Sequence, residues 1–323
     1  MLTIRPTPFA PTLPSVAKQE RSLTDSAKFQ QMIEGYQSDL KNRIMQGEAG
    51  YKTAQVDKGH QRYKDIVTLQ KTAINAPTPG GMTLPANYIN LGTDKGVIRS
   101  QYPTAEGVTN FKSMLAEKRI TIVVVIADSN MLDHSQGKYR TEHPAYFANK
   151  ENLKNYISPP VNNIEIDCYQ MPLKDGNNKT IPINFAHIKN WQDHTAFGKN
   201  EIRELAEIVT TLHQRALNNF QKQGSQAVKA DVKTLPVIHC SAGVGRTGQL
   251  IAAMELINPD SRLSLESIIK TLREEGNPMM VQTSAQMDVL IDLAKDLDKP
   301  LWTKDEQHST RQQAPISHSV NYL

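Results

Sequence analysis

The distribution of apolar and polar residues along the chain predicts alternating strands and helices. Residues 120–127 are continuously apolar and rich in β-branched side chains, which is typical of a strand buried on both faces of a sheet. Residues 164–168 instead alternate between apolar and polar, and Asp-Gly-Asn-Asn at 175–178 favours a turn into a partner strand at 181–189. Further short strands are expected over 84–90, 97–103 and 237–240.

Helices are predicted where apolar residues recur at intervals of three or four positions. The segments with this pattern are 22–46, 104–117, 201–221, 249–257, 263–273 and 289–297. In the first of them, Thr24 or Asp25 can cap the N-terminus, and we expect this helix either to cover the flank of a domain or to bind a partner. Strands that alternate with helices predict an α/β fold: a single domain with a twisted mixed sheet and helices on both faces.

The two ends of the chain differ in composition from its centre. Residues 1–21 contain four prolines and few large apolar side chains, which is typical of a flexible arm. The last residues, 303–323, are mostly polar and are expected to form a tail. We therefore divide the chain into the arm, a helical segment at 22–54, a main domain at 55–302 and the tail.

Composition limits the classes of function. Lys and Arg number 37 against 33 Asp and Glu, and this net charge of +4 is too small to indicate binding to nucleic acid. The two cysteines form neither a disulfide framework nor a cysteine-rich zinc site, and Cys168 falls on the apolar face of a predicted strand. No apolar run is long enough for a membrane span, and the N-terminus does not resemble a signal peptide. We expect no metal, no cofactor and a monomer.

The most informative stretch is 237–248, Val-Ile-His-Cys-Ser-Ala-Gly-Val-Gly-Arg-Thr-Gly. An apolar strand ends at Cys240, a tight glycine-containing loop follows, and a helix begins. This order of elements turns the backbone N–H groups of the loop into one concavity at a helix N-terminus, and such a concavity binds anions. The loop residues expected to line it are Ser241, Ala242, Gly243, Val244 and Gly245.

The side chains of this stretch suit attack on a phosphate ester. The helix N-terminus favours the thiolate form of Cys240, which is a good nucleophile toward phosphorus. The planar guanidinium of Arg246 can hold two phosphoryl oxygens. Thr247 can place a hydroxyl near the sulfur as it leaves, and His239 is expected to orient the loop and favour the thiolate. The predicted intermediate is a cysteinyl-phosphate that water then hydrolyses.

The spacing His-Cys-x5-Arg-Thr-Gly at 239–248 resembles the signature of the protein tyrosine phosphatase family. A nucleotide-binding P-loop is a poor alternative, because its Gly-x4-Gly-Lys-Ser/Thr pattern is absent. The resemblance covers about residues 55–302 and implies hydrolysis of phosphotyrosine in proteins.

Residues 61–65, Gln-Arg-Tyr-Lys-Asp, resemble the phosphotyrosine-recognition loop of the same family, with Gln61 in place of the usual asparagine. Tyr63 is expected to wall a deep slot and to stack on the phenyl ring of the substrate. Such a slot admits phosphotyrosine, whereas phosphoserine is too short to reach Cys240. Asp65 can accept a hydrogen bond from a backbone N–H of the substrate.

Residues 191–193, Trp-Gln-Asp, resemble the family's Trp-Pro-Asp loop. Expulsion of a tyrosyl oxygen needs a proton donor, and an aspartate on a mobile loop can supply it as the slot closes. We expect Asp193 to be the general acid, and then the base for the attacking water, with Trp191 as the anchor of the loop. Gln192 replaces the proline, which frees φ and can shift the balance between open and closed positions.

Residues 279–286 resemble the glutamine loop of the family. Gln282 is expected to position the attacking water through both ends of its amide. Gln286 is expected to help bind the phosphate or that water.

The motifs are most similar to those of tyrosine phosphatases that pathogenic bacteria inject through type III secretion. This resemblance implies delivery into a host cell, host phosphotyrosine proteins as substrates, and a secretion chaperone as a possible partner of the N-terminal segment. One family element has no clear counterpart here. A glutamate usually steadies the signature arginine, and only Asp128 or Asp133 lies in the corresponding region.

Two other functions remain open from sequence alone. One is a broader phosphatase that acts on phosphoserine, phosphothreonine or phosphoinositides; Tyr63 and the lack of lysine within the signature argue against it. The other is a module that binds phosphotyrosine without turnover, which only Gln192 favours.

Overall fold

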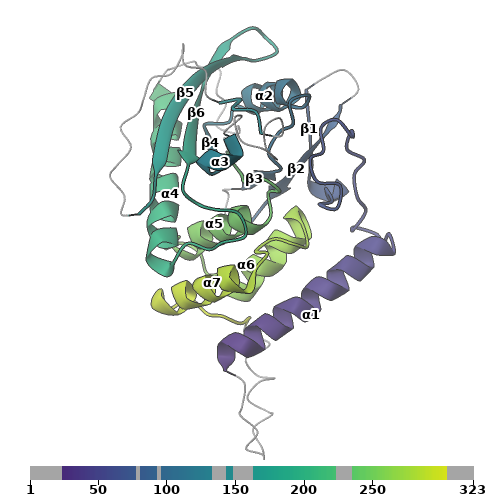
Figure 1. Ribbon diagram of the computed structural model, residues 1–323, viewed down its shortest axis with the longest axis vertical. Coiled ribbons are helices and arrows are strands. Elements are labelled where there is room, and N and C mark those ends of the chain that lie inside the picture. Colours follow the sequence, from purple (N-terminus) through teal and green to yellow (C-terminus); the bar gives the residue numbers. More distant parts are fainter. Residues whose placement is uncertain are drawn as a thin grey trace, which may run out of the picture.

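A computed structural model describes residues 24–77, 81–92, 96–132, 143–147, 163–222 and 235–303. Within these ranges the centre of the molecule is a seven-stranded mixed sheet with the order β1-β2-β3-β7-β4-β6-β5 (Figure 1). The strands are β1 (Ala73–Asn75), β2 (Thr83–Ile89), β3 (Val97–Ser100), β4 (Ile122–Ile126), β5 (Ile166–Lys174), β6 (Thr180–Ile188) and β7 (Pro236–His239). The α/β fold and the mixed sheet predicted from sequence are confirmed.

The four strands in the middle of the sheet, β3, β7, β4 and β6, run parallel to one another. Strands β1 and β2 on one side, and β5 on the other, pair in the antiparallel direction. The carboxyl ends of β3, β7, β4 and β6 therefore meet at one edge of the sheet, where the loops that follow them can build a common site.

Helices cover both faces of the sheet. Helices α4 (Lys199–Lys222), α5 (Gly245–Leu256), α6 (Leu265–Thr271) and α7 (Ser284–Asp296) lie on one side, and α2 (Val108–Glu117) lies on the other (Figure 1). Strand β4 is buried along its whole length: Val124 packs into the cluster beneath α4, α5 and α7, whereas Val123 and Val125 pack into the cluster beneath α2. Burial on both faces explains the continuous apolar run in the sequence.

Strands β5 and β6 form the predicted hairpin. Asp175 makes the turn by accepting hydrogen bonds through Oδ1 from the backbone N–H groups of Asn177 and Lys179, at 3.0 and 2.8 Å. Cys168 lies in the core as expected, and burial raises the pKa of its thiol. This cysteine is therefore less reactive than an exposed thiol.

The first helix, α1 (Asp25–Met45), begins at the Thr24 cap predicted from sequence, where the Thr24 hydroxyl accepts from the Ala27 N–H. It crosses the outside of α6 and α7 at the lower edge of the molecule (Figure 1). Phe29, Ile33 and Leu40 are buried beneath it, and the ring of Phe29 meets Trp302 edge-on at 5.1 Å between centroids. The helix is thus packed against the main domain.

Several predicted boundaries need correction. The helix expected from 249 begins at Gly245, and the helix expected from 289 begins at Ser284, where the Thr283 hydroxyl accepts from the Gln286 N–H. The helix expected from 104 begins at Val108, because the Thr104 hydroxyl accepts from the Gly107 N–H and forms a turn before it. Strand β3 ends at Ser100 rather than 103, because the next N–H groups bond to Pro85 and Ser241 instead of a ladder partner. The helix predicted to 273 ends at Thr271, and a π-helical turn, η3 (Leu272–Gly276), follows.

The predicted arm at 1–21 and the predicted tail beyond Thr303 lie outside the described residues. A short helix, α3 (Ser129–Leu132), follows β4. Among the helices that are described, none is both long and apolar enough to cross a membrane.

The packing of α1 gives the first testable prediction. Phe29→Ala should lower the free energy of unfolding by about 3–5 kcal/mol, because it empties a fully buried aromatic site between α1 and Trp302. Met45→Ala at the end of the same helix is the matched control, since Met45 is 84% exposed and should change stability by less than about 0.5 kcal/mol. Urea unfolding followed by circular dichroism measures both. An unchanged free energy of unfolding in Phe29→Ala, or a separate unfolding transition for α1, would contradict this packing.

Candidate active site

The signature loop lies at the carboxyl edge of the sheet. Cys240 follows β7 directly and is only 3% exposed. Gly243 has a φ of +72°, and a Cβ there would collide with the Ser100 carbonyl oxygen, so this position requires glycine. The Ser241 carbonyl accepts from the Tyr102 N–H at 2.9 Å, which ties the loop to the segment after β3. The sharp path of the loop thus depends on β3 as well as β7.

Helix α5 begins immediately behind the loop. Its N-cap residue is Val244, and no side chain of the described residues caps it. The first N–H groups of a helix have no partner within the helix, and the helix dipole makes this end positive. The loop and the start of α5 therefore have the geometry of an anion site beside Cys240.

The segment before Gln282 supports the loop from behind. The Val281 N–H donates to the Val244 carbonyl at 3.2 Å. A Cβ on Gly248 would lie 2.6 Å from the Val281 nitrogen, so the close approach of the two segments depends on that glycine.

Two further residues predicted from the signature are buried on either side of the loop, His239 at the end of β7 and Thr247 in the first turn of α5. The Thr247 hydroxyl is buried and has no hydrogen-bond partner among the described residues, which leaves it free to serve a group that binds there. The His239 ring bonds through Nε2 to the Tyr146 hydroxyl at 2.6 Å and through Nδ1 to the Cys240 carbonyl at 3.2 Å. Burial lowers the pKa of His239 to about 4, so its neutral ring acts on the loop through geometry rather than charge.

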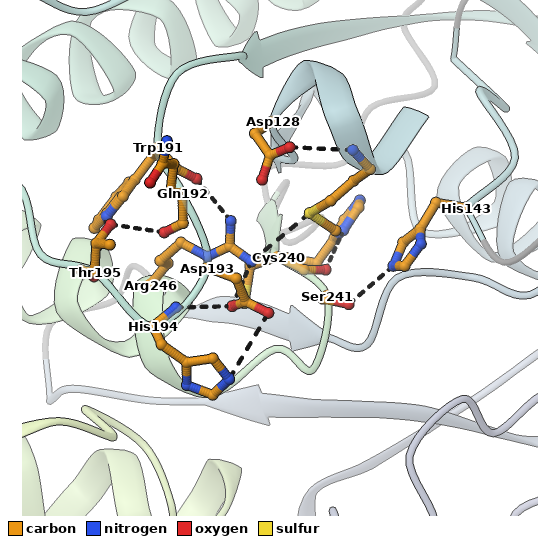
Figure 2. A network of polar contacts seen from close by, with 12 residues as sticks. Asp128, His143, Trp191, Gln192, Asp193, His194, Thr195, Cys240, Ser241 and Arg246 are labelled. Atoms are coloured by element: carbon orange, nitrogen blue, oxygen red, sulfur yellow. Dashed lines mark hydrogen bonds and ion pairs between the residues drawn. The ribbon is translucent and has the colours of Figure 1, made fainter. Parts of the chain in front are cut away.

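Arg246 connects the signature loop to the Trp191–Asp193 loop. Its side chain is completely buried. Nη1 donates to the Trp191 carbonyl and Nη2 to Asp193 Oδ1, both at 2.7 Å. Figure 2 shows the Asp193 carboxylate directed at the guanidinium. Two segments that are far apart in the sequence, the signature loop and the Trp191–Asp193 loop, therefore meet at this arginine.

The Trp191 indole anchors its loop. Trp191 is fully buried and stacks on Phe197 with 4.5 Å between ring centroids. The Gln192 carbonyl accepts from the Thr195 hydroxyl at 2.7 Å, so a turn forms here without the proline of the family pattern. The carboxylate of Asp193 is 46% exposed, in keeping with a group that can move toward a bound substrate.

In the region where the family usually has a glutamate, the described residues place the Met131 side chain next to Arg246. The Met131 sulfur lies 3.9 Å from Nη2, and the Arg246 Nε has no partner among the described residues. Asp128 instead accepts from the Met131 N–H at 3.1 Å and caps α3, and Asp133 lies outside the described residues. Within the described part of the chain, Asp193 is thus the carboxylate that pairs with Arg246.

The recognition segment lies against the signature loop. The Tyr63 hydroxyl is 2.6 Å from the Ser241 hydroxyl. Gln101 fixes the backbone of Tyr63, accepting from its N–H at 2.9 Å and donating to its carbonyl at 3.1 Å. Asp65 is exposed, as a residue that contacts a peptide substrate must be. The tyrosine is therefore placed at the wall of the anion site.

The two glutamines predicted for the site lie next to each other but differ in environment. Gln282 is exposed, and its amide oxygen lies 3.1 Å from the point where a Cβ on Gly245 would be, so it faces the start of α5. Gln286 is buried: Oε1 accepts from the Gln282 N–H at 2.9 Å, and Nε2 donates to the Thr195 carbonyl at 3.1 Å. Gln286 thus links the glutamine loop to the Trp191 loop, while its contact with phosphate stays a prediction.

Sequence reasoning missed two contacts of the loop from residues 143–147. Tyr146 bonds to His239, and His143 Nε2 lies 2.9 Å from the Ser241 hydroxyl. Burial lowers the pKa of His143 to about 3, so this ring is neutral. The one signal in the sequence was the cluster His-Pro-Ala-Tyr-Phe within a polar region.

Comparison with known proteins agrees with the geometry. A family model described as protein-tyrosine phosphatase matches residues 57–296. The chain is 34% identical over 249 residues to tyrosine-protein phosphatase YopH of Yersinia enterocolitica, which covers 74% of this chain and 51% of the relative. It is 29% identical over 217 residues to secreted effector protein SptP of Salmonella typhi, covering 64% of this chain and 37% of the relative. The chain therefore spans about half the length of these curated relatives, or less.

Solved structures show the same fold. A structure of PTPN18 in complex with HER2 phosphopeptides gives a TM-score of 0.59 at 17% identity, covering 83% of this chain and 93% of that one. TcPTP1 of Trypanosoma cruzi gives 0.57 at 18% identity, with 87% and 97% covered.

The ion pair at Arg246 generates the second prediction. Asp193→Asn removes the carboxylate partner of a buried guanidinium and should lower the free energy of unfolding by about 1–3 kcal/mol. In a Met131→Glu background the same change should cost less than about 0.5 kcal/mol, because the new carboxylate pairs with Arg246. Met131→Gln is the uncharged control. For each Met131 substitution, urea unfolding of the wild type, the two single variants and the double variant measures the coupling energy between positions 131 and 193. If Asp193→Asn lowered the free energy of unfolding equally in all backgrounds, Asp193 would not balance the charge of Arg246.

Proposed function

Since the chain belongs to the protein-tyrosine phosphatase family, we propose that it hydrolyses phosphotyrosine in proteins through a cysteinyl-phosphate on Cys240. The observation that carries this proposal is the meeting of Cys240, Arg246 and Asp193 at the N-terminus of α5. A nucleophile, a cation for the phosphoryl oxygens and a carboxyl group for proton transfer are what this reaction requires.

In the first step, the phosphoryl group binds between the loop N–H groups and the guanidinium of Arg246. Phosphate oxygens replace Asp193 on Nη2, and the aspartate turns toward the oxygen that leaves. The Cys240 sulfur attacks phosphorus, the bond to the tyrosyl oxygen breaks, and Asp193 gives its proton to that oxygen. The products are cysteinyl-phosphate and a neutral tyrosine side chain.

In the second step, water attacks the phosphorus of the cysteinyl-phosphate. Gln282 faces the start of α5 and can orient this water, while Asp193 accepts its proton. The sulfur leaves as a thiolate, to which the unpartnered Thr247 hydroxyl, in the first turn of α5, donates a hydrogen bond. Inorganic phosphate is released and Cys240 is regenerated.

Selectivity for tyrosine is expected from the position of Tyr63. Its hydroxyl is held at Ser241 and its backbone by Gln101, so the ring stands as a fixed wall beside the anion site. A phosphate on a long aromatic side chain reaches Cys240 past such a wall, and a phosphate on serine or threonine does not.

The biological setting that we propose is delivery into a host cell, with host phosphotyrosine proteins as substrates and the protein acting as a monomer. Similarity to a relative named as a secreted effector supports this. Export would depend on the N-terminal arm at 1–21, assisted by a chaperone. Fusion of residues 1–21 to a reporter should give export in a bacterium with a type III secretion system and none in its secretion-deficient mutant. Equal export from both would contradict this route.

A comparison of three phosphopeptides tests the reaction itself. Phosphate release should occur from a phosphotyrosine peptide, at least about 100-fold faster than from matched phosphoserine and phosphothreonine peptides, because only phosphotyrosine reaches the nucleophile. Cys240→Ser should abolish release while retaining binding of the phosphotyrosine peptide. Release from all three peptides would indicate a broader phosphatase. Binding by the unmodified protein without release would indicate a phosphotyrosine reader.

The role of Asp193 as proton donor can be tested by comparing substrates with different leaving groups. Asp193→Ala should slow hydrolysis of a tyrosyl phosphate by about 100- to 10,000-fold, since a poor leaving group depends on its proton donor. The loss should be smaller for p-nitrophenyl phosphate, whose leaving group needs less help. Asp292→Ala, an exposed acid on α7, is the control. An unchanged rate on tyrosyl phosphate would rule out Asp193 as the general acid.

A further inference from the structure

Helix α1 lies outside residues 57–296 that the family model matches, yet it is packed beside the segment that carries Gln282. A small cavity of about 70 Å³ separates them, lined by Gln30, Ile33, Glu34 and Gln37 of α1 and by residues of the glutamine loop, including Gln282 itself. The contacts across this boundary are therefore able to influence the geometry of the site.

Arg273 makes the central contact. It lies in the π-helical turn η3 and is only 3% exposed. Nη1 donates to the Ile33 carbonyl of α1 at 2.7 Å, while Nε donates to the Met280 carbonyl at 3.2 Å and Nη2 reaches the Val281 carbonyl at 3.5 Å. One buried guanidinium thus holds α1 and the two residues that precede Gln282.

Val281 has a backbone conformation that needs such support. Its φ is +56°, in the left-handed region that β-branched residues rarely adopt. A residue persists there only when its surroundings impose it. Here the Val281 N–H donates to the Val244 carbonyl of the signature loop. The carbonyl groups of Met280 and Val281 both accept from Arg273. This conformation sets the direction in which the chain continues to Gln282.

Three more contacts join α1 to the chain on either side of the loop. Gln37 Nε2 donates to the Pro278 carbonyl at 2.9 Å. Gln30 bonds to Asp288 on α7, and the Tyr36 hydroxyl bonds to Glu274 in η3. Helix α1 therefore contacts the elements before and after Gln282 as well as Arg273.

We propose that α1 and Arg273 position Gln282 for the second chemical step, the hydrolysis of the cysteinyl-phosphate. Arg273 is a positioning residue: it holds the strained Val281, and α1 holds Arg273. The inference rests on the proposed function, in which Gln282 orients the attacking water. Loss of these contacts should slow hydrolysis of the intermediate and leave its formation nearly unchanged, because the partners of Arg246 in the described part of the chain come from the Trp191–Asp193 loop and Met131 rather than from α1.

The test uses Arg273→Met and Arg273→Lys in the full chain, with p-nitrophenyl phosphate as substrate. Because the first step releases the leaving group irreversibly, kcat/KM reports formation of the intermediate, and kcat reports hydrolysis once that step is slow. Arg273→Met should lower kcat by about 10- to 100-fold through misplacement of Gln282. KM should fall in proportion, so that kcat/KM stays within about twofold. Arg273→Lys should lower kcat by a smaller factor.

A milder variant protects the test against a failure of Arg273→Met to fold. Gln37→Ala removes the bond from α1 to the Pro278 carbonyl and the contact with the Met279 sulfur, and it should change kcat and KM in the same direction by a smaller factor. Lys41→Ala, an exposed position on α1, is the matched control and should leave both unchanged. Rapid acid quench followed by intact mass spectrometry should show a larger fraction of phosphorylated enzyme at steady state in the Arg273 and Gln37 variants than in the wild type.

The outcomes separate this inference from the proposed function. A parallel fall of kcat and kcat/KM with no accumulation of phosphoenzyme would overturn the inference, and so would unchanged kinetics in Gln37→Ala and Arg273→Lys. Gln282→Ala should accumulate phosphoenzyme in the same way. If Gln282→Ala does so and the Arg273 variants do not, the inference is wrong while the proposed function stands. If the wild type does not hydrolyse phosphotyrosine at all, the proposed function itself is wrong.

Discussion

The buried charge of Arg246 is the constraint on which the rest of the site depends. A guanidinium without access to water must find oxygen partners, and leaving it unpaired is costly. The protein provides the Trp191 carbonyl and the Asp193 carboxylate, both from a loop about 50 residues away in sequence from the signature. The same arginine that prepares an anion site therefore also docks the loop that carries the carboxyl group. In the reaction that we propose, a bound phosphate takes over the role of Asp193 at Nη2, and this exchange couples substrate binding to release of the acid.

The sheet explains why such distant segments meet. Parallel strands β3, β7, β4 and β6 bring their carboxyl ends to one edge, and each is followed by a segment that contributes to the site. The loop after β7 supplies Cys240, the segment after β6 supplies Asp193, the one after β3 supplies Gln101, and the one after β4 supplies Met131. The glutamine loop then closes the back of the signature loop through the bond from Val281 to Val244.

The fold, and the segments that carry the proposed reacting groups, could be predicted from sequence because each requires a particular residue type or pattern. Strand β4 is a continuous apolar run, and Cys240 and Arg246 stand in a spacing that few other sites use. Supporting residues gave no such signal. Met131 looks like a core methionine after an apolar strand, and Arg273 like any arginine in a helix; their roles follow from tertiary contacts alone. The strain at Val281 is equally invisible, because valine is a residue that sequence patterns assign to strands.

Covalent catalysis by Cys240 is the central claim, and trapping the intermediate tests it most directly. The protein would be mixed with a phosphotyrosine peptide, quenched within milliseconds in acid, digested, and mapped by mass spectrometry. We expect phosphate on the peptide that contains Cys240, present in the unmodified protein and absent in Cys240→Ser. Release of inorganic phosphate with no phosphorylated Cys240, or with phosphate on another residue, would contradict the account.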